Sequence, residues 1–457
     1  MMRRLARLAQ LQRAWELQPP VPVHRATTAN LRAVQAQAAT SFGSRGVYIG
    51  LNLSNGTAFT YDPWELYGQQ LHDANLAILG AIGKAKSSLV KTYLLRQLVF
   101  GRRALVLSPK PDEYDRFAEA CGVVPVRVYP GGPWRLNPLD VNVPDDNRYT
   151  TTRTEQLKVL RALAEATLGR TLSPDERNAI RAALDAADPH RDSGQLTLPQ
   201  VVERLLWPTA LMAEGSGASL GELRAEARPV GLALSDLVGG ALGGMFDAPT
   251  SSQLDLNAQT VVFDLARLRG SEALGMLMTC MSATLTNHLL SAPGPARRGV
   301  NTIMVLEEAW AVLGDLGMAR YFQALAKLSR QMGLQNVFVL HRLSDLEAVG
   351  AEGSEQVKLA RGLVADCGTK VIYGQPDSEL DATQALLQLG NAQRAMLRGL
   401  PRGQALWIIG DARRSAIVEH VLSPTERDIV DTDHAMVQAG GPAVTAAGAL
   451  PPQGEAP

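Results

Sequence analysis

The chain has 457 residues, of which 46% are hydrophobic and 20% are charged, so a large core can form and global disorder is excluded. Lysine and arginine together number 45, as do aspartate and glutamate, which excludes a generally basic nucleic-acid binder and leaves DNA contact to a local patch. Cys121, Cys280 and Cys367 lie far apart in the chain and match no zinc spacing, a pattern that fits a reducing compartment.

Residues 1–45 are predicted to form a helical leader. Leu5, Leu8, Leu11 and Trp15 recur at helical spacing, which indicates an amphipathic helix. The apolar stripe fits a docking or core face, and it also fits a membrane surface. No apolar run in the sequence approaches the roughly 20 residues of a membrane helix, and no signal-peptide core follows the basic N-terminus.

Residues 46–149 are predicted to contain strands that alternate with helices. Two β-rich runs, at 47–51 and 57–61, flank Asn55-Gly56, and this pattern predicts a hairpin. Buried strands are then expected at 76–79, 103–107 and 126–129. Strands separated by helices favour a mainly parallel sheet with right-handed crossovers, and therefore an α/β fold.

A glycine-containing loop joins the strand at 76–79 to the helix that follows it. Lys86 and Ser87 open this helix, and a strand, loop, Lys-Ser and helix in this order form a phosphate cradle. The loop N–H groups and the helix N-terminus attract phosphate oxygens, Lys86 would meet the terminal phosphates, and the Ser87 hydroxyl would meet Mg²⁺. A plain strand-to-helix turn is the alternative. The candidate ATP-binding residues are Gly80, Ala81, Ile82, Gly83, Lys84, Ala85, Lys86, Ser87 and Ser88.

One position departs from the usual phosphate-loop pattern. Ala85 stands where a glycine usually precedes the lysine. Its methyl group would crowd the loop if the backbone needs a positive φ there, because only glycine reaches that region without a steric cost.

The rest of the chain divides into three predicted parts. Residues 150–245 contain few β-rich runs and are expected to form an all-helical insertion, with a capping box at Ser173 and Glu176. Residues 246–436 are expected to complete the α/β core. Its predicted strands are 260–265, 302–306, 336–340, 369–373 and 405–409. Residues 437–457 are rich in Gly, Ala and Pro and are expected to form a disordered tail.

The predicted strand at 302–306 ends in two carboxylates, Glu307 and Glu308. We expect this strand to lie beside the phosphate-loop strand, where the first acid would help to hold Mg²⁺ and the second would polarise the attacking water. Asp-Glu is the commoner pair, and the longer Glu307 would shift the metal contact. The alternative is a charged strand end that meets solvent.

These motifs together resemble a known family. Gly80-Ala-Ile-Gly-Lys-Ala-Lys-Ser87, Glu307-Glu-Ala-Trp310 and Arg330-Gln-Met-Gly333 occur in the order typical of the motor ATPases of type IV secretion and conjugation, within the FtsK/HerA superfamily. The segment at 108–114 is similar to that family's Asp-Pro-Lys-Gly-Glu-Tyr segment, with two changes and one extra residue. The resemblance covers residues 46–436 and is nearest to the compact actinobacterial form.

The resemblance implies a RecA-like P-loop NTPase core that binds ATP and Mg²⁺ and works as a ring, expected to be a hexamer. It implies that Glu308 and Lys86 are catalytic, and that Ser87 and Glu307 bind the metal. It also implies two further catalytic roles: His341 takes the place of a γ-phosphate-sensing Gln, and Arg330 serves as an arginine finger. A surface His and a solvated helix-end Arg are the alternatives for the last two. Expected partners are a second copy, other secretion or conjugation components, and DNA. The expected location is the cytoplasm, including peripheral association with the inner face of the cell membrane through partners.

Two other functions remain open at this level. One is a DNA pump or helicase of the same superfamily that has no part in secretion. The other is a nucleotide-binding assembly protein with weak or no hydrolysis, a reading that Ala85 and Glu307 both favour.

Overall fold

The computed structural model describes residues 45–140, 148–187, 195–240, 242–269, 273–291, 300–313, 316–344, 355–411 and 414–430. The leader predicted for residues 1–45 lies outside this set, apart from Arg45, and the tail predicted for residues 437–457 lies wholly outside it. All the elements below belong to the larger of two compact units, Ser41–Pro457.

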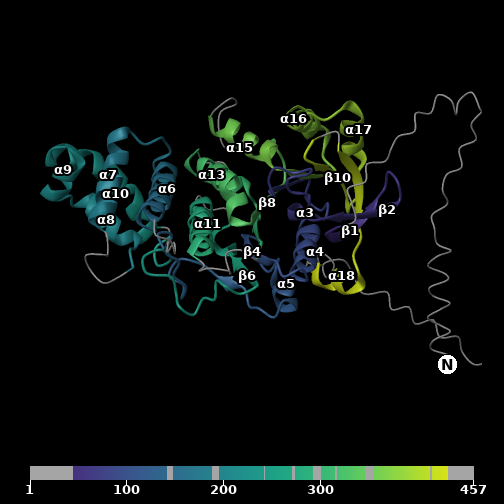
Figure 1. Ribbon diagram of the computed structural model, residues 1–457, viewed down its shortest axis with the longest axis horizontal. Helices are drawn as coiled ribbons and strands as arrows, with labels where there is room; N and C mark the ends of the chain where they lie inside the picture. Colours follow the sequence, from purple (N-terminus) through teal and green to yellow (C-terminus); the bar gives the residue numbers. More distant parts are fainter. Residues whose placement is uncertain are drawn as a thin grey trace, which may run out of the picture. The chain divides into compact units, whose positions relative to one another are not determined.

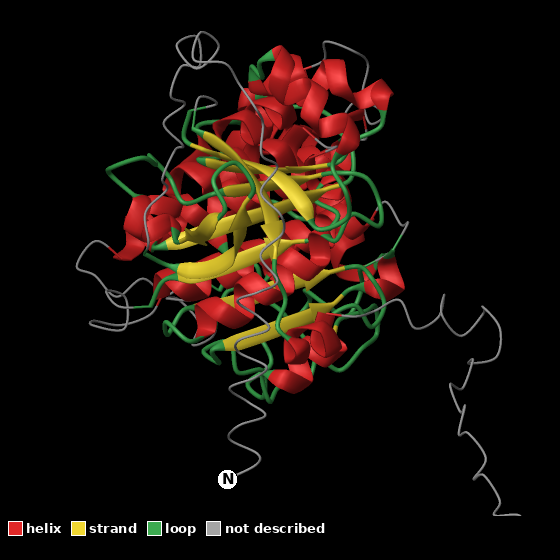
Figure 2. Cartoon of the chain, turned by 90° about the vertical axis from the view of Figure 1, so that its right-hand side faces the viewer, coloured by secondary structure: helices red, strands yellow, loops and turns green. Residues whose placement is uncertain are grey.

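A single sheet organises the described residues, with the strand order β2-β1-β11-β10-β9-β3-β8-β7-β4-β6-β5 (Figures 1 and 2). The pairs from β9 through β3, β8, β7, β4 and β6 to β5 are parallel, whereas β2, β1, β11 and β10 add an antiparallel edge that begins with the β10–β9 pair. The strands are β1 (Val47–Asn52), β2 (Thr57–Tyr61), β3 (Leu76–Leu79), β4 (Arg103–Ser108), β5 (Val126–Arg127), β6 (Thr260–Asp264), β7 (Thr302–Leu306), β8 (Leu334–Leu340), β9 (Thr369–Tyr373), β10 (Gln404–Ile409) and β11 (Ser415–His420). The predicted α/β fold with a mainly parallel sheet is therefore confirmed.

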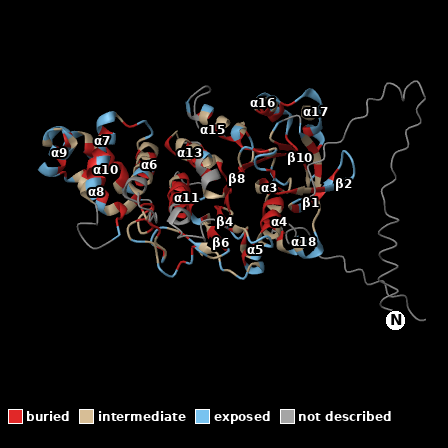
Figure 3. Cartoon of the chain, in the orientation of Figure 1, coloured by how far each residue is buried: buried red, intermediate tan, exposed pale blue. Residues whose placement is uncertain are grey.

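The central strands are buried on both faces, which explains why their sequences are continuous apolar runs. In β3, Leu76 and Ile78 belong to one core cluster, and Ala77 and Leu79 belong to the other. Helices α4 (Lys86–Leu98) and α5 (Asp115–Ala120) contribute to the first cluster. Helices α11 (Ala273–Ser291), α13 (Leu316–Met332) and α15 (Glu355–Asp366) contribute to the second. Figure 3 shows buried residues along the central strands and helices α4 and α11, and also in α10.

Among the described residues between β5 and β6, helices are the only regular elements. They are α6 (Arg148–Leu168), α7 (Pro174–Ala186), α8 (Leu198–Leu206), α9 (Ala210–Ser216) and α10 (Leu220–Gly239). The predicted capping box is present, because Ser173 accepts a hydrogen bond from the Glu176 N–H and Glu176 accepts one from the Ser173 N–H. Further helices of the described residues are α3 (Pro63–Leu66), α12 (Trp310–Leu313), α16 (Asp377–Leu387), α17 (Asn391–Gly399) and α18 (Pro424–Val430).

Helix α6 joins this group of helices to the core by packing against α13 (Figure 1). The two backbones approach closely at Gly317, where a Cβ atom would lie 2.7 Å from the Ala162 carbonyl oxygen and 2.9 Å from the Glu165 Cβ. Arg320 of α13 forms an ion pair with Glu165 at 3.3 Å. Glycine at position 317 therefore permits this close contact, because any side chain there would push the two helices apart.

The hairpin predicted from Asn55-Gly56 is present as β1 and β2. The Asn55 side chain accepts a hydrogen bond from the Thr57 N–H, and Gly56 has a φ of 68°. The sequence did not predict β11, which pairs with both β10 and β1 and so joins the hairpin to the rest of the sheet.

His420, the last residue of β11, is held against helix α4. Its Nε2 shares a hydrogen bond of 2.8 Å with the Thr92 hydroxyl. Burial, together with the positive charge of Arg96, lowers the pKa of His420 to about 4, although Glu426 opposes the shift. The imidazole is therefore neutral in the folded protein at neutral pH.

This burial predicts an acid-sensitive stability. Unfolding exposes His420 and returns its pKa to about 6.5. The contribution of this residue to the free energy of unfolding is therefore fully present above pH 6.5, and it is lost as the pH falls towards 4. Denaturant titrations between pH 7.5 and 5 measure the slope, and His420→Gln should show a flatter one. Equal slopes for the parent and the variant over that range would contradict the assignment.

No helix among the described residues is long and apolar enough to cross a membrane.

Candidate functional site

The loop after β3 takes the backbone conformations that a phosphate cradle needs. Gly80 has a φ of 154°, and a Cβ atom there would lie 2.5 Å from the Tyr373 Cβ of the adjacent strand β9. Gly83 has a φ of 78°, and Ala85 has a φ of 75°. Position 85 is therefore in the left-handed region, as the usual glycine would be, although it carries a methyl group.

Helix α4 begins directly after this loop, and its first turn is open to an anion. Ala85 is the N-cap residue and makes no side-chain capping hydrogen bond, so the N-terminal N–H groups are left for a ligand. The Lys86 ammonium donates to the carbonyl oxygens of Gly80 and, at 2.9 Å, Ala81. Lys86 thus lies within the turn of the loop, where the phosphates of a nucleotide are expected.

The outer side of the loop is tied to neighbouring segments. The Lys84 ammonium donates to the Leu400 carbonyl at 3.0 Å, and the Ala81 N–H donates to the Gly374 carbonyl. Ile82 lies at the tip and is 78% exposed. These contacts fit an ATP-binding loop, because Lys84 and Ala81 fix its outer side while the Lys86 ammonium and the start of helix α4 lie at its inner side.

The conformation of Ala85 leads to a specific prediction. Placing an L-residue in the left-handed region costs roughly 1–2 kcal/mol, and glycine removes that cost. Ala85→Gly should therefore bind ATP more tightly or turn over faster than the parent, by about tenfold if most of the strain is present in the ATP-bound or reacting state. Equilibrium ATP titration and steady-state turnover of both proteins measure the effect. A weaker-binding, slower glycine variant would mean that the loop accommodates Ala85 without strain.

The expected adjacency of the acidic strand and the phosphate-loop strand is wrong. Strand β8 lies between β3 and β7, pairing in parallel with each. Its Leu340 is in register with Leu79, and its Phe338 is in register with Leu306. The residue that follows β8, His341, therefore emerges between the phosphate loop and the two glutamates.

Glu308 lies at the centre of this edge of the sheet. Its Oε1 is 2.9 Å from His341 Nε2, and its Oε2 accepts from the Trp310 indole N–H at 2.7 Å. Burial alone would raise the pKa of Glu308, but the hydrogen bond from His341, the charge of Lys110 and the Trp310 contact together lower it to about 2. Its φ is 55°, an unusual value for a residue with a side chain and one that recurs at functional sites.

Glu307 is fully buried, and both of its carboxylate oxygens have protein donors. The Lys110 ammonium reaches Oε2 at 2.9 Å, and the Tyr114 hydroxyl donates to Oε1 at 2.8 Å. A carboxylate can accept further hydrogen bonds, so Glu307 fits a contact with Mg²⁺ through water better than direct ligation. Among the described residues, no group of three or more His, Cys, Asp or Glu is arranged to hold a metal by itself. The donors fit a metal that also takes oxygens from water and phosphate.

The remaining predicted residue, Arg330, lies on α13 within the Arg-x-x-Gly segment that precedes β8. Its side chain lies outside the described set, so its role as an arginine finger stays a prediction. Sequence reasoning did not assign Lys110, Tyr114 or Trp310 to the site. The signal for the first two was available, because both belong to the segment at 108–114 on which the family resemblance partly rests.

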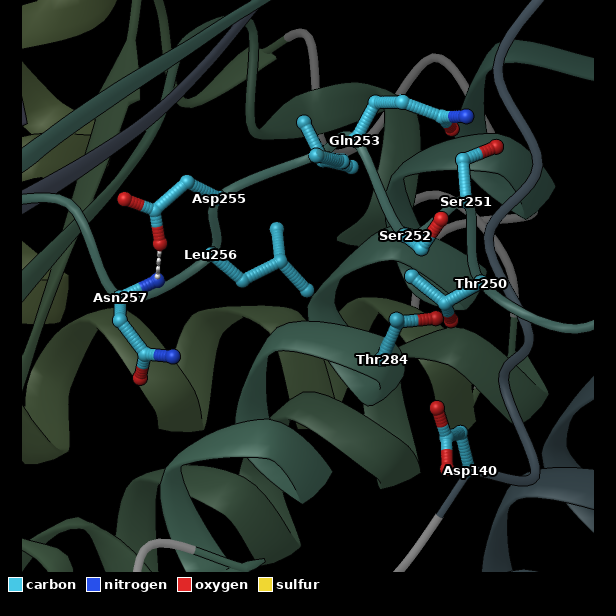
Figure 4. A pocket seen from close by; sticks show the side chains of 10 residues that line it. Asp140, Thr250, Ser251, Ser252, Gln253, Asp255, Leu256, Asn257 and Thr284 are labelled. Atoms are coloured by element: carbon cyan, nitrogen blue, oxygen red, sulfur yellow. Dashed lines mark hydrogen bonds between the residues drawn. The ribbon is translucent and has the colours of Figure 1, made fainter.

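A separate cavity of about 390 Å³ lies away from these residues (Figure 4). It is lined by Asp140, Thr284 of α11 and the segment 250–257, which precedes β6. None of its lining residues belongs to the phosphate loop or to the acidic pair, and it adjoins residues outside the described set. It is therefore not the candidate nucleotide site.

Comparison with solved structures identifies the fold. VirB4 of Thermoanaerobacter pseudethanolicus matches with a TM-score of 0.64 and 21% identity, over 85% of this chain and 99% of that one. The unbound bacterial conjugative coupling protein TrwB matches with a TM-score of 0.56 and 16% identity, over 83% of this chain and 90% of that one. TrwB in complex with ADP and Mg²⁺ matches with a TM-score of 0.52 and 16% identity, over 84% and 97% of the two chains.

No family model matches this sequence, and no curated protein matches it either. The solved structures nevertheless agree with the resemblance predicted from the motifs, which is thereby confirmed. This chain has the RecA-like P-loop NTPase fold that it shares with VirB4 and TrwB.

Proposed function

We propose that this protein is an ATP-hydrolysing ring motor of a type IV secretion or conjugation-like system, which powers the transfer of DNA or protein. One observation carries the proposal. The carboxyl ends of β3, β8 and β7 bring the phosphate loop, His341 and Glu308 to one edge of the sheet. The fold shared with TrwB, whose solved forms include a complex with ADP and Mg²⁺, supports the choice of ligands.

Each side chain has a distinct part in the proposed hydrolysis. Lys86 exchanges the Gly80 and Ala81 carbonyls for the terminal phosphates of ATP. Ser87 and Glu307 would hold Mg²⁺, which would neutralise phosphate charge. Glu308 stays ionised at neutral pH, so its carboxylate can accept a hydrogen bond from the attacking water and polarise it. His341 contacts Glu308, and this contact supports the proposal that His341 senses the γ-phosphate.

The ring, its partners and its location are part of the same proposal. A subunit interface at the site would allow Arg330 of a neighbouring copy to act as an arginine finger. A hexamer in the cytoplasm, associated peripherally with the membrane through other secretion components, fits this activity. Native mass measurement with and without Mg-ATP tests the ring: a nucleotide-dependent closed oligomer supports the motor, and a monomer under both conditions contradicts it.

A second candidate is a nucleotide-binding assembly protein that hydrolyses ATP weakly. Two observations favour it, namely the positive φ of Ala85 and the engagement of both Glu307 oxygens by Lys110 and Tyr114. A DNA pump unrelated to secretion is the third. Turnover of Mg-ATP with and without DNA separates the assembly protein, which stays slow under both conditions, from the motors. Stimulation by DNA indicates a motor that moves DNA, within secretion or outside it, and fast turnover without DNA indicates a motor that transfers protein.

A further inference from the structure

Lys110 comes into contact with both acidic residues because of how its strand ends. It lies two residues beyond β4, which pairs in parallel with β7, and Leu107 of β4 is in register with Leu306. Pro109 and Pro111 flank it in the sequence, and a proline fixes its own φ and restricts the residue before it. The backbone of Lys110 is therefore constrained before any side-chain contact forms.

The Lys110 ammonium lies between the two carboxylates. It is 2.9 Å from Glu307 Oε2 and 3.6 Å from Glu308 Oε1. The side chains of Glu307 and Glu308 are 0% and 7% exposed, and that of Lys110 is 17% exposed. Adjacent buried carboxylates repel one another and are costly to bury without a counter-charge, so the ammonium stabilises the pair as it stands.

A second set of contacts fixes the segment that carries Lys110. The Tyr114 hydroxyl donates to the other oxygen of Glu307, at 2.8 Å. Lys91, a fully buried residue of α4, forms an ion pair with Glu113 at 2.7 Å and lies 5.3 Å from the centre of the Tyr114 ring. The segment is thus attached both to the helix that begins at the phosphate loop and to the end of β7.

We propose that Lys110 is a positioning residue for hydrolysis: anchored by Glu307, it holds the Glu308 carboxylate in the orientation that the reaction uses. This inference rests on the proposed ATPase activity. Lys110 acts on Glu308 through an ion pair rather than on ATP, so its loss should affect the chemical step more than ATP binding. His341 and Trp310 hold Glu308 from other directions, and they would draw the carboxylate towards themselves once the ammonium is gone.

The test compares steady-state turnover of Mg-ATP by the parent, Lys110→Met and Lys110→Arg. Methionine keeps an unbranched apolar stem and removes the charge, whereas arginine restores the charge. We expect kcat of the methionine variant to fall by about tenfold or more with KM within about twofold, and arginine to recover much of kcat. Lys158→Met is the matched control, because Lys158 pairs with Glu155 on the surface of α6 and should behave like the parent.

The outcomes are separable. Equal kcat for the parent and Lys110→Met, or a change in KM alone, would overturn this inference and leave the ATPase assignment standing. A parent that binds ATP and never hydrolyses it would overturn both. If Lys110→Met does not fold, Lys110→Gln decides, since it also removes the charge beside Glu308 while keeping a polar side chain: a lower kcat at constant KM supports the inference, and parental kinetics contradict it.

Discussion

Replacing Glu308 with glutamine should reduce ATP turnover by at least about a hundredfold while ATP still binds, because a positioned general base contributes roughly 10²–10⁴ to a rate. The amide preserves the shape of the side chain. Its oxygen can keep the hydrogen bond from Trp310, and its NH₂ group can face His341 if Nε2 of that ring is the acceptor. The amide cannot accept a proton from water as the carboxylate does. Phosphate release measures turnover, and equilibrium titration measures binding.

The same variant should trap any oligomer that forms on ATP binding, since the nucleotide persists. Glu155→Gln on the surface of α6 is the control, because it makes the same chemical change at an exposed ion pair far from the site in the sequence. Parental turnover by Glu308→Gln would show that another group activates the water, and the assignment of Glu308 would be wrong.

Replacing Lys86 with alanine should remove most ATP binding. The lysine offers a positive charge to the β- and γ-phosphates, and a hydrogen bond to a charged group contributes roughly 1.5–3 kcal/mol, which corresponds to about ten- to a hundredfold in affinity. The ammonium lies against the Gly80 and Ala81 carbonyls, within the turn of the proposed phosphate loop. Equilibrium titration with ATP measures the loss.

Lys158→Ala serves as the control for this experiment, as it removes a lysine from the surface of α6. A thermal melt of both variants shows whether they remain folded. Unchanged ATP affinity in a folded Lys86→Ala protein would remove the phosphate-loop assignment, whatever the fold suggests.

The local elements could be predicted from the sequence, because their signals are local. The apolar run of β3, the glycines that follow it and the Lys86-Ser87 helix start lie within a few residues of one another. The capping box at Ser173 is likewise a contact between near neighbours in the chain. The order of the motifs along the chain added the overall fold through the family resemblance, since that order is typical of the family.

The order of strands across the sheet could not be predicted in the same way. That β8 separates β3 from β7 depends on which strands pair, and distant residues decide the pairing. Strand β11 was missed for a similar reason: it is half-buried and mixed in composition, and its pairing with β1 and β10 stabilises it.

The side chains at the site also differ in whether nearby or distant residues in the sequence determine their contacts. Glu308 and Lys86 follow from motifs, and the structure places them at the same edge of the sheet. The contacts of Lys110 with Glu307 and Glu308 join residues almost two hundred positions apart in the sequence, and only the β4–β7 pairing brings them together. The positive φ of Ala85 is a property of the folded loop. The sequence alone could predict strain at this position only for the case that the backbone takes a positive φ there.

The close contact between α6 and α13 at Gly317 gives the helical group a mechanical connection to the site. Helix α13 spans Leu316–Met332, a length of about 25 Å, and one residue separates it from β8, which ends next to His341. A helix is stiff along its axis, and the missing side chain at Gly317 leaves no soft layer between the two backbones. The helices from α6 to α10 are therefore coupled rigidly to α13, and a tilt of this group would be passed through Gly333 to the start of β8, the strand that ends before His341.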